Sequence, residues 1–291
     1  MREKIQMKNM FKYYLSNKRR GISLIFVMAL TVFSIYFVTS LVQSIFSTVE
    51  YSNIACLNDF SFVYPVGGSS FLQNETVEKI KNDDSVENAY PILLEYTVIN
   101  NIFGTTSGYA AFMEAADIKE IFNDYSLTVT EGRLPQENSY ELIMHEDMLK
   151  NKGLSVGDTF GSAVDEGEQI DGKYMITGAF SGNSYMAFGT KSYKQKELEE
   201  LGLDFQNTTF GLLVTPKADL DTMNTMLDTM SHDEAAAMTL SYAQKTLKDN
   251  VSSIKFLMGV IVIVIAVSIS AAVCIVLETT YNDRMEEFGI L

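Results

Sequence analysis

Residues 21–46 read GISLIFVMALTVFSIYFVTSLVQSIF, and residues 254–277 read IKFLMGVIVIVIAVSISAAVCIVL. A helix rises about 1.5 Å per residue, so roughly 20 apolar residues cross a hydrocarbon core of about 30 Å. Both stretches are long enough, and the first stays uncharged from Gly21 to Val49. The sequence therefore predicts two transmembrane helices that bracket a large domain.

A cleavable signal peptide is the rival interpretation of the first stretch, because basic residues precede it. The apolar run is longer than that of a signal peptide, and no Ala-x-Ala cleavage site follows it. We therefore expect an uncleaved helix.

The orientation follows from Lys and Arg near the two spans, because these charges resist translocation. Seven basic residues lie within residues 1–20, whereas Lys79 is the first basic residue after the first span. The N-terminus is therefore expected in the cytoplasm, and two spans return the C-terminus there. Lys245, Lys248 and Lys255 beside the second span weigh against this orientation, but the first span dominates it. We expect a multi-pass protein of the cell (plasma) membrane with residues 47–253 extracytoplasmic.

The region between the spans is strongly acidic. Residues 50–253 contain 32 Asp plus Glu and 13 Lys plus Arg, a net charge of −19. Such a surface disfavours nucleic acid and anionic lipid as partners. It either favours cations and cationic peptides or serves solubility alone.

Several kinds of reaction chemistry are missing from the sequence. The segment from Pro65 to Ser70 has glycines but lacks the Lys of a phosphate-binding loop, and no Gly-x-Ser-x-Gly elbow occurs. Cys56 and Cys274 fall in different regions, so neither a disulfide nor a metal-ligand spacing is expected. We expect no catalytic residue, no cofactor-binding residue, no metal site and no enzyme activity in this chain.

The two histidines each precede acidic residues. His145-Glu146-Asp147 lies where a predicted strand meets a predicted helix, and acidic residues are favourable at a helix start. His232-Asp233-Glu234 is three adjacent residues, which do not converge on one ion. We interpret both as features of helix starts or caps rather than as metal sites.

Short apolar runs alternate with turn residues from Phe60 to Pro216, the pattern of half-buried strands with short helices between them. The predicted strands are Phe60–Val63, Ala89–Ile99, Tyr109–Met113, Glu141–Met144, Lys173–Phe180, Tyr185–Phe188 and Phe210–Val214. The predicted helices are Thr76–Asn82, Glu146–Asn151 and Ser192–Leu201. The fold class predicted for residues 47–216 is an α+β extracytoplasmic domain between two transmembrane α-helices.

After Pro216 the apolar spacing becomes helical and stays so up to the second span. We expect a helical stalk over residues 217–253 that enters the membrane without a break. Its methionines either pack in a core or form an adaptable binding surface. The predicted organisation is a basic elbow (1–20), a first span (21–46), a domain (47–216), a stalk (217–253), a second span (254–277) and a cytoplasmic coupling tail (278–291).

Four segments occur in a characteristic order. They are Thr130-Glu-Gly-Arg-Leu-Pro135, Tyr140-Glu-Leu-Ile-Met-His145, Gly153-Leu-Ser-Val-Gly-Asp-Thr-Phe160 and Lys173-Tyr-Met-Ile-Thr-Gly-Ala-Phe180. This order resembles the MacB-like periplasmic core domain of MacB/FtsX-type ABC transporter permeases. The family's turn motifs correspond to Gly132, Arg133, Pro135, Gly157 and Asp158.

Both ends of the chain add to the resemblance. The basic segment Leu15–Ile25 resembles the elbow before the first span of these permeases, and Arg284-Met-Glu-Glu-Phe-Gly-Ile-Leu291 is similar to the signature after their second span. The resemblance implies that Arg284, Glu287, Phe288 and Gly289 couple the chain to an ATPase. Glu286 replaces the commoner basic residue, and Phe288 replaces the commoner Ile.

The resemblance implies a permease subunit, a homodimer or heterodimer in the lipid bilayer, that partners a cytoplasmic ABC ATPase. Its expected cargo is a peptide, lipoprotein or drug, and an extracytoplasmic peptide or protein is a possible ligand. The family signature continues into further spans, so the chain is expected to be the N-terminal half of a permease. The alternatives are an FtsX-like regulator of cell-wall hydrolases, a two-span membrane sensor and a membrane-anchored adhesion domain.

Overall fold

The computed structural model describes residues 18–101, 104–204, 208–230 and 235–287. The chain forms two compact units. The helical unit consists of residues 1–44 and 250–291, and the domain unit consists of residues 45–249.

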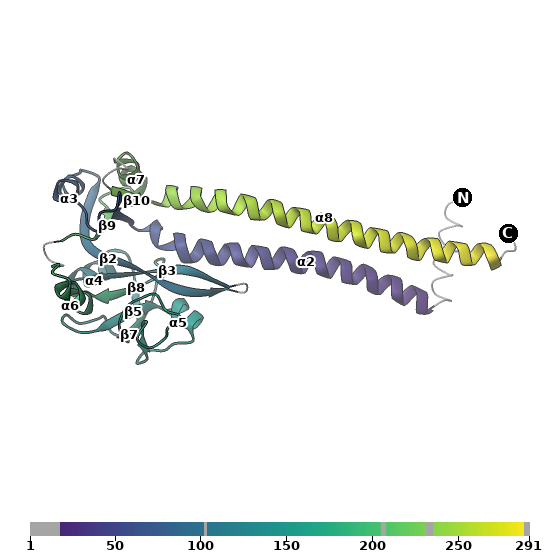
Figure 1. Ribbon diagram of the computed structural model, residues 1–291, viewed down its shortest axis with the longest axis horizontal. Helices are drawn as coiled ribbons and strands as arrows, with labels where there is room; N and C mark the ends of the chain where they lie inside the picture. The colour runs from purple at the N-terminus through teal and green to yellow at the C-terminus, as the bar shows by residue number, and fades with distance from the viewer. Residues whose placement is uncertain (1–17, 102–103, 205–207, 231–234, 288–291) are drawn as a thin grey trace. The chain divides into compact units, whose positions relative to one another are not determined.

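Two long helices begin and end the described chain. Helix α2 (Lys18–Ile54) has 37 residues and helix α8 (Leu240–Glu287) has 48 residues (Figure 1). Their most apolar parts, Ile25–Ser52 and Met258–Ile275, have mean hydropathies of 2.3 and 2.9 and are long and apolar enough to cross a membrane. In the most apolar 18-residue window of each part, no residue is buried within the chain. The prediction of an α+β domain between two apolar helices is confirmed.

Short helices and strands make up the rest of the domain unit. The helices are the 3-10 helix η1 (Ala55–Asn58), α3 (Asn74–Lys81), α4 (Ala115–Asp124), α5 (Glu146–Lys152), α6 (Ser192–Glu200) and α7 (Leu220–Asp228). The strands are β1 (Ser61–Pro65), β2 (Val86–Asn101), β3 (Gly104–Met113), β4 (Thr128–Gly132), β5 (Glu141–His145), β6 (Thr159–Phe160), β7 (Tyr174–Ser181), β8 (Met186–Thr190), β9 (Gly211–Pro216) and β10 (Ala235–Met238).

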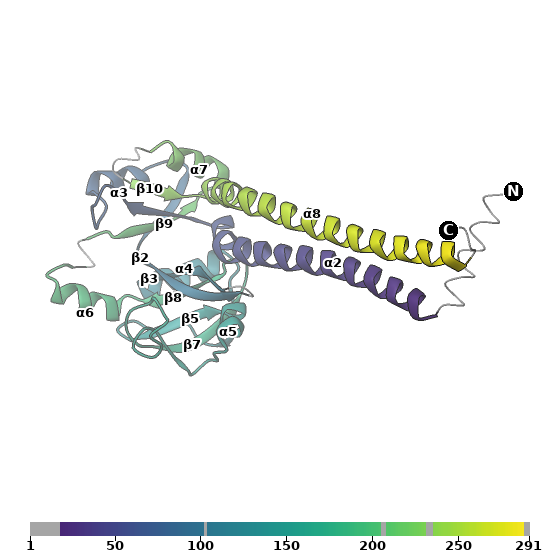
Figure 2. The same ribbon diagram turned by 45° about the vertical axis from the view of Figure 1, so that its right-hand side comes forward.

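The strands form one mixed sheet in the order β10-β1-β9-β2-β3-β8-β5-β7-β4, and β6 pairs with β7. The pairs β3 with β8 and β5 with β7 are parallel, and the other neighbouring pairs are antiparallel. The long strand β2 joins two parts of this sheet, because its first half pairs with β9 and its second half pairs with β3 (Figure 2).

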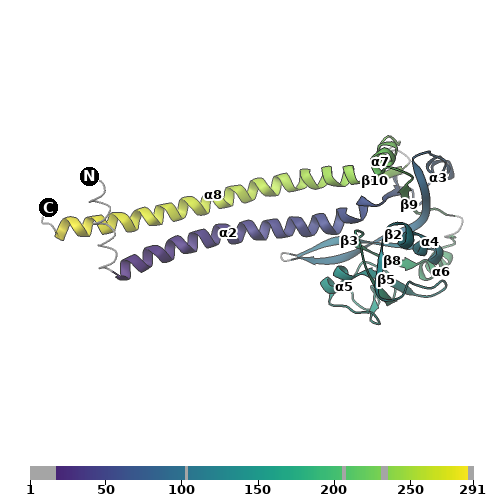
Figure 3. The same ribbon diagram turned by 180° about the vertical axis from the view of Figure 1, so that it is seen from behind.

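Each part of the sheet has helices that bury their apolar stripes on it. Val77 and Ile80 of α3 lie in one core cluster with Met223 and Leu227 of α7 and with strands β1 and β9. Helix α4 lies beside β8, as Figure 3 shows from behind. Its three buried residues recur at the spacing of one helix face, so burial of apolar area is what places it there.

Seven predicted strands and three predicted helices are confirmed, each within a few residues of its expected ends. The helix α4 and the strands β4 and β6 were not predicted. The prediction of a continuous helical stalk over residues 217–253 is wrong in part, because Ala235–Met238 forms strand β10 between α7 and α8. Phe62 to Pro65 of β1 pairs with this strand, so tertiary pairing overrides the helix propensity of its alanines.

Candidate functional site

Gly132 ends strand β4 in a left-handed conformation with φ +71°. A Cβ atom at this position would lie 2.2 Å from the carbonyl oxygen of Thr177 on β7. The next amide, that of Arg133, donates a hydrogen bond of 2.9 Å to the same oxygen. Glycine is therefore required both by the backbone conformation and by the close approach of β7.

Arg133 is held by Glu141, the first residue of β5. Its Nη1 and Nη2 atoms donate to Oε2 and Oε1 of Glu141 at 2.8 and 2.6 Å. The amide of Gln136 also donates to Oε2 of Glu141, at 2.8 Å. Pro135, which precedes Gln136 in the sequence, is buried. The hydrogen bond from Arg133 holds the pKa of Glu141 below its usual range. The Gly-Arg-x-Pro turn is thus fixed to β5 by its arginine.

The Val-Gly-Asp turn is hydrogen-bonded to Ile176 of β7, the residue before Thr177. Gly157 has φ +99°, and its amide donates to the carbonyl oxygen of Ile176 at 2.8 Å. The amide of Ile176 donates in turn to the carbonyl oxygen of Asp158 at 2.9 Å. The Asp158 carboxylate accepts from the amide of Ser155 at 2.9 Å and so closes the turn. The structure therefore brings both predicted turns together at residues 176–177.

His145 caps helix α5, as expected for a helix start. Its Nδ1 atom accepts a hydrogen bond of 3.2 Å from the amide of Asp147, and Nε2 lies 3.2 Å from the carbonyl oxygen of Gly182. Burial lowers the pKa of His145, because the charged ring would lose its hydration. Helix α5 ends at Lys152, and Gly153, with φ +66°, caps its C-terminal end.

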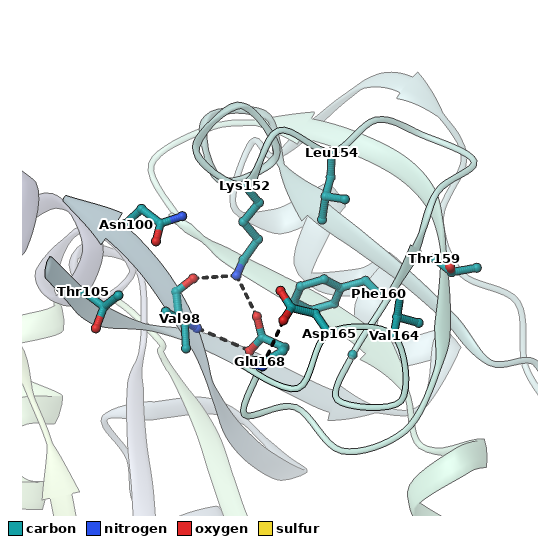
Figure 4. A pocket seen from close by; sticks show the side chains of 12 residues that line it. Val98, Asn100, Thr105, Lys152, Leu154, Thr159, Phe160, Val164, Asp165 and Glu168 are labelled. Carbon is teal, nitrogen blue, oxygen red and sulfur yellow. Dashed lines mark hydrogen bonds and ion pairs between the residues drawn. The ribbon is translucent and has the colours of Figure 1, made fainter. Parts of the chain in front are cut away.

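A cavity of about 360 Å³ lies between the β2–β3 hairpin, the end of α5 and the segment after β6. Its wall contains a buried ion pair, in which Nζ of Lys152 lies 2.7 Å from Oε2 of Glu168 (Figure 4). The two side chains are 8% and 3% exposed. Lys152 also donates to the carbonyl oxygen of Val98 at 2.5 Å and lies 4.9 Å from the centre of the Phe160 ring.

Glu168 has partners for both carboxylate oxygens. Oε2 accepts from the hydroxyl of Thr97 at 3.0 Å in addition to Lys152. Oε1 accepts from the amides of Val98 at 3.3 Å and Gln169 at 2.8 Å. Both charged groups therefore have hydrogen-bond partners, and the pair connects the segment after β6 to strand β2.

Sequence reasoning missed both members of this pair. Lys152 and Glu168 are separated by a glycine-containing segment and match no motif. The structure describes only two of the four predicted coupling residues in the tail. Arg284 and Glu287 lie on α8, and the predicted coupling residues Phe288 and Gly289 lie outside the described residues.

No group of three or more His, Cys, Asp or Glu side chains in the described part of the chain could hold a metal ion. The thiol of Cys56 is fully buried, and burial raises its pKa, so it is not poised as a nucleophile.

Comparison with protein-family models gives no match, and comparison with curated proteins gives none either. Among solved structures, the chain is similar to the periplasmic region of MacB from Actinobacillus actinomycetemcomitans, with 10% identity and a TM-score of 0.38 over 67% of this chain and 94% of that chain. It is also similar to the extracellular domain of the ABC-type transporter YknZ from Gram-positive bacteria, with 12% identity and a TM-score of 0.34 over 62% of this chain and 99% of that one. Both similar structures are extracytoplasmic parts of their own proteins.

Proposed function

We propose that the chain is a membrane-spanning permease subunit of an ABC transporter. A separate cytoplasmic ATPase subunit binds the tail that contains Arg284 and Glu287, and ATP hydrolysis there moves α8 and the domain unit. The subunit acts as a homodimer or heterodimer, and its cargo is an exported peptide, lipoprotein or drug.

The continuity of α8 carries this proposal. The helix extends from Leu240 to Glu287 without interruption, which corresponds to about 72 Å of helix. Its first turns belong to the domain unit, and the apolar part Met258–Ile275 follows in the helical unit. Long helices curve gently and kink only at specific features such as Pro, and α8 contains no Pro. A displacement at the tail can therefore be passed along the helix.

The two turns that are hydrogen-bonded to residues 176 and 177 of β7 support the same proposal. Because the Gly132 and Gly157 turns are both bonded to adjacent residues of β7, this part of the domain unit is a stiff structure rather than a set of independent loops. A stiff domain can be displaced as one body.

Insertion of Gly-Gly after Lys248 tests the mechanical role of α8. We expect loss of transport or of transport-dependent resistance, because two glycines weaken the helix locally. Insertion of Ala-Ala at the same place is the matched control, since it shifts the helix register equally and keeps the helix. Full activity of the Gly-Gly chain contradicts the mechanism, and equal loss in both chains assigns the defect to register rather than stiffness.

Affinity purification of the tagged chain from mild detergent tests the partner. We expect an ATPase with a phosphate-binding loop to copurify, and we expect Arg284→Ala and Glu287→Ala to reduce its amount. Asn282→Ala, on the same helix, serves as the control. A chain that purifies without any such ATPase contradicts the proposed function.

A further inference from the structure

The ring of His145 is fixed as one neutral tautomer by its hydrogen bonds. A backbone amide donates to Nδ1, so Nδ1 carries no proton, and a carbonyl oxygen at Gly182 can only accept, so Nε2 carries one. Gly182 has φ +149°, and a Cβ atom there would lie 2.6 Å from Cδ2 of Leu127, so this position is suited to glycine. Protonation of the ring therefore has to break one existing hydrogen bond.

Three aromatic side chains surround this ring. The ring centres of Phe180 on β7 and Tyr185 before β8 lie 5.4 and 5.5 Å from the centre of the His145 ring. Tyr51, near the end of α2, lies 6.3 Å away in an edge arrangement and 4.8 Å from Tyr185. We call Tyr51, His145, Asp147, Phe180 and Tyr185 the His145 cluster. It joins the end of α2 to β5, α5 and β7 within the domain unit.

The charged groups that face the cluster come mainly from α5. Asp147 contacts the hydroxyl of Tyr51 at 3.5 Å and pairs with Lys150 at 3.0 Å, and Glu146 lies 3.9 Å from Lys150. The other titratable groups are the hydroxyls of Tyr51 and Tyr185, and burial raises the pKa of Tyr185, so it stays neutral. Within this set, the Asp147 carboxylate acts more strongly on a charged His145 ring than the Glu146 carboxylate does.

We propose that the His145 cluster is a proton-sensitive contact that holds the end of α2 against β5, α5 and β7 at neutral pH and releases it in acid. A proton on Nδ1 removes the acceptor for the Asp147 amide and places a positive charge in a ring that is 2% exposed. The Asp147 carboxylate then turns to the charged ring and leaves the Tyr51 hydroxyl. Tyr51 thereby loses its contact with the Asp147 carboxylate, and the His145 ring beside it is no longer neutral.

The direction of the pH dependence follows from the buried neutral ring. The folded chain holds His145 at a lower pKa than the unfolded chain, whose value is about 6.5. The contact is therefore fully present above about pH 6.5 and is lost as the pH falls through the lower pKa of the folded chain. These contacts all lie inside the domain unit and do not depend on the proposed transport function.

Histidine NMR of the full chain in detergent tests the tautomer. The chain has two histidines, so His232→Gln leaves His145 as the single imidazole signal. With ¹⁵N-labelled histidine we expect the Nε2–H pattern at neutral pH and a titration midpoint below about 6.5. The Nδ1–H pattern, or a midpoint at or above the ordinary value, overturns the proposal.

Hydrogen exchange of the segment around Tyr51 tests the release. In the full chain we expect its protection to fall about tenfold or more between neutral pH and pH 5, with labelling times adjusted for the intrinsic exchange rate. In His145→Asn the protection should not change with pH, because Asn can cap α5 but does not titrate in this range. Equal acid loss in both chains, or none in the wild type, overturns the proposal.

If His145→Asn does not fold, the variant Tyr51→Phe tests the same acid-dependent release of the segment around Tyr51. This variant lacks only the hydroxyl that contacts Asp147, so the segment should be less protected at neutral pH and its exchange should depend less on acid. An acid response as large as that of the wild type shows that Asp147 does not mediate the release, and it overturns the proposal.

Discussion

The guanidinium of Arg133 and the carboxylate of Glu141 form a two-point ion pair, with N to O distances of 2.8 and 2.6 Å. Arg133 belongs to the turn after β4 and Glu141 begins β5, so the pair fixes the turn to the strand. The side chains are 46% and 12% exposed, which limits the strength of the pair through solvent screening.

Arg133→Lys should lower the free energy of unfolding by about 1 kcal/mol, because an ammonium group cannot bond both carboxylate oxygens in one plane. Thermal unfolding of the detergent-solubilised chain measures this loss. Lys150→Gln is the control, since it removes ion pairs of an exposed lysine on α5 and should change the midpoint little. Equal midpoints for Arg133→Lys and the wild type contradict the assigned role.

The same pair predicts an acid dependence. Because Arg133 lowers the pKa of Glu141, the pair stabilises the fold above the unfolded value of about 4.3, and this contribution is lost as the pH falls through the lower folded pKa. Glu141→Gln should therefore be less stable than the wild type at neutral pH, and the difference should shrink below about pH 4. A stability difference that does not vary with pH contradicts the assignment.

Gly132→Ala and Gly157→Ala separate backbone strain from steric contact. Both positions have positive φ, but a Cβ at Gly132 would meet the Thr177 oxygen at 2.2 Å, whereas a Cβ at Gly157 has no atom within 4 Å. We expect a loss of about 1–2 kcal/mol for Gly157→Ala and a clearly larger loss, or failure to fold, for Gly132→Ala. Unfolding midpoints of the two variants, measured side by side, decide the point. Similar losses at both positions are the contrary result.

Breaking the buried pair of Lys152 and Glu168 should be strongly destabilising. Lys152→Met leaves a buried carboxylate and Glu168→Gln leaves a buried ammonium, so each should cost about 3–5 kcal/mol. In the double variant Lys152→Met/Glu168→Gln no buried charge remains, and the loss should be smaller than the sum of the two single losses. Strict additivity in this double-mutant cycle rules out direct coupling.

The predicted topology can be tested with a membrane-impermeant thiol reagent. Glu200→Cys, at an exposed position of α6, should react in intact cells, whereas Lys8→Cys should react only after the membrane is permeabilised. The native Cys56 is buried, and Cys274 lies in the apolar part of α8, so the wild-type chain provides the background. Labelling of Lys8→Cys in intact cells reverses the predicted orientation.

Local pattern was enough for much of the fold. The predicted strand at Tyr109–Met113 and the predicted helix at Glu146–Asn151 match β3 and α5, because alternation and helix-start residues act within a few neighbouring residues. Helix α4 was missed although Ile118, Ile121 and Phe122 form one apolar face, a signal that was present in the sequence. Strand β10 could not be predicted in this way, because its alanines favour a helix and only β1 makes them a strand.

The sequence by itself determined the two apolar helices, the strand-forming runs and the glycines that permit the turns, since these depend on length, periodicity and local conformation. Only the tertiary structure decided that the Gly132 and Gly157 turns meet at residues 176–177, that Lys152 pairs with Glu168, and that Tyr51 lies beside His145. Tyr51 and His145 are far apart in the chain, and their contact depends on the order of the strands between them. Strand order is set by burial over the whole sheet, which no local stretch of residues encodes.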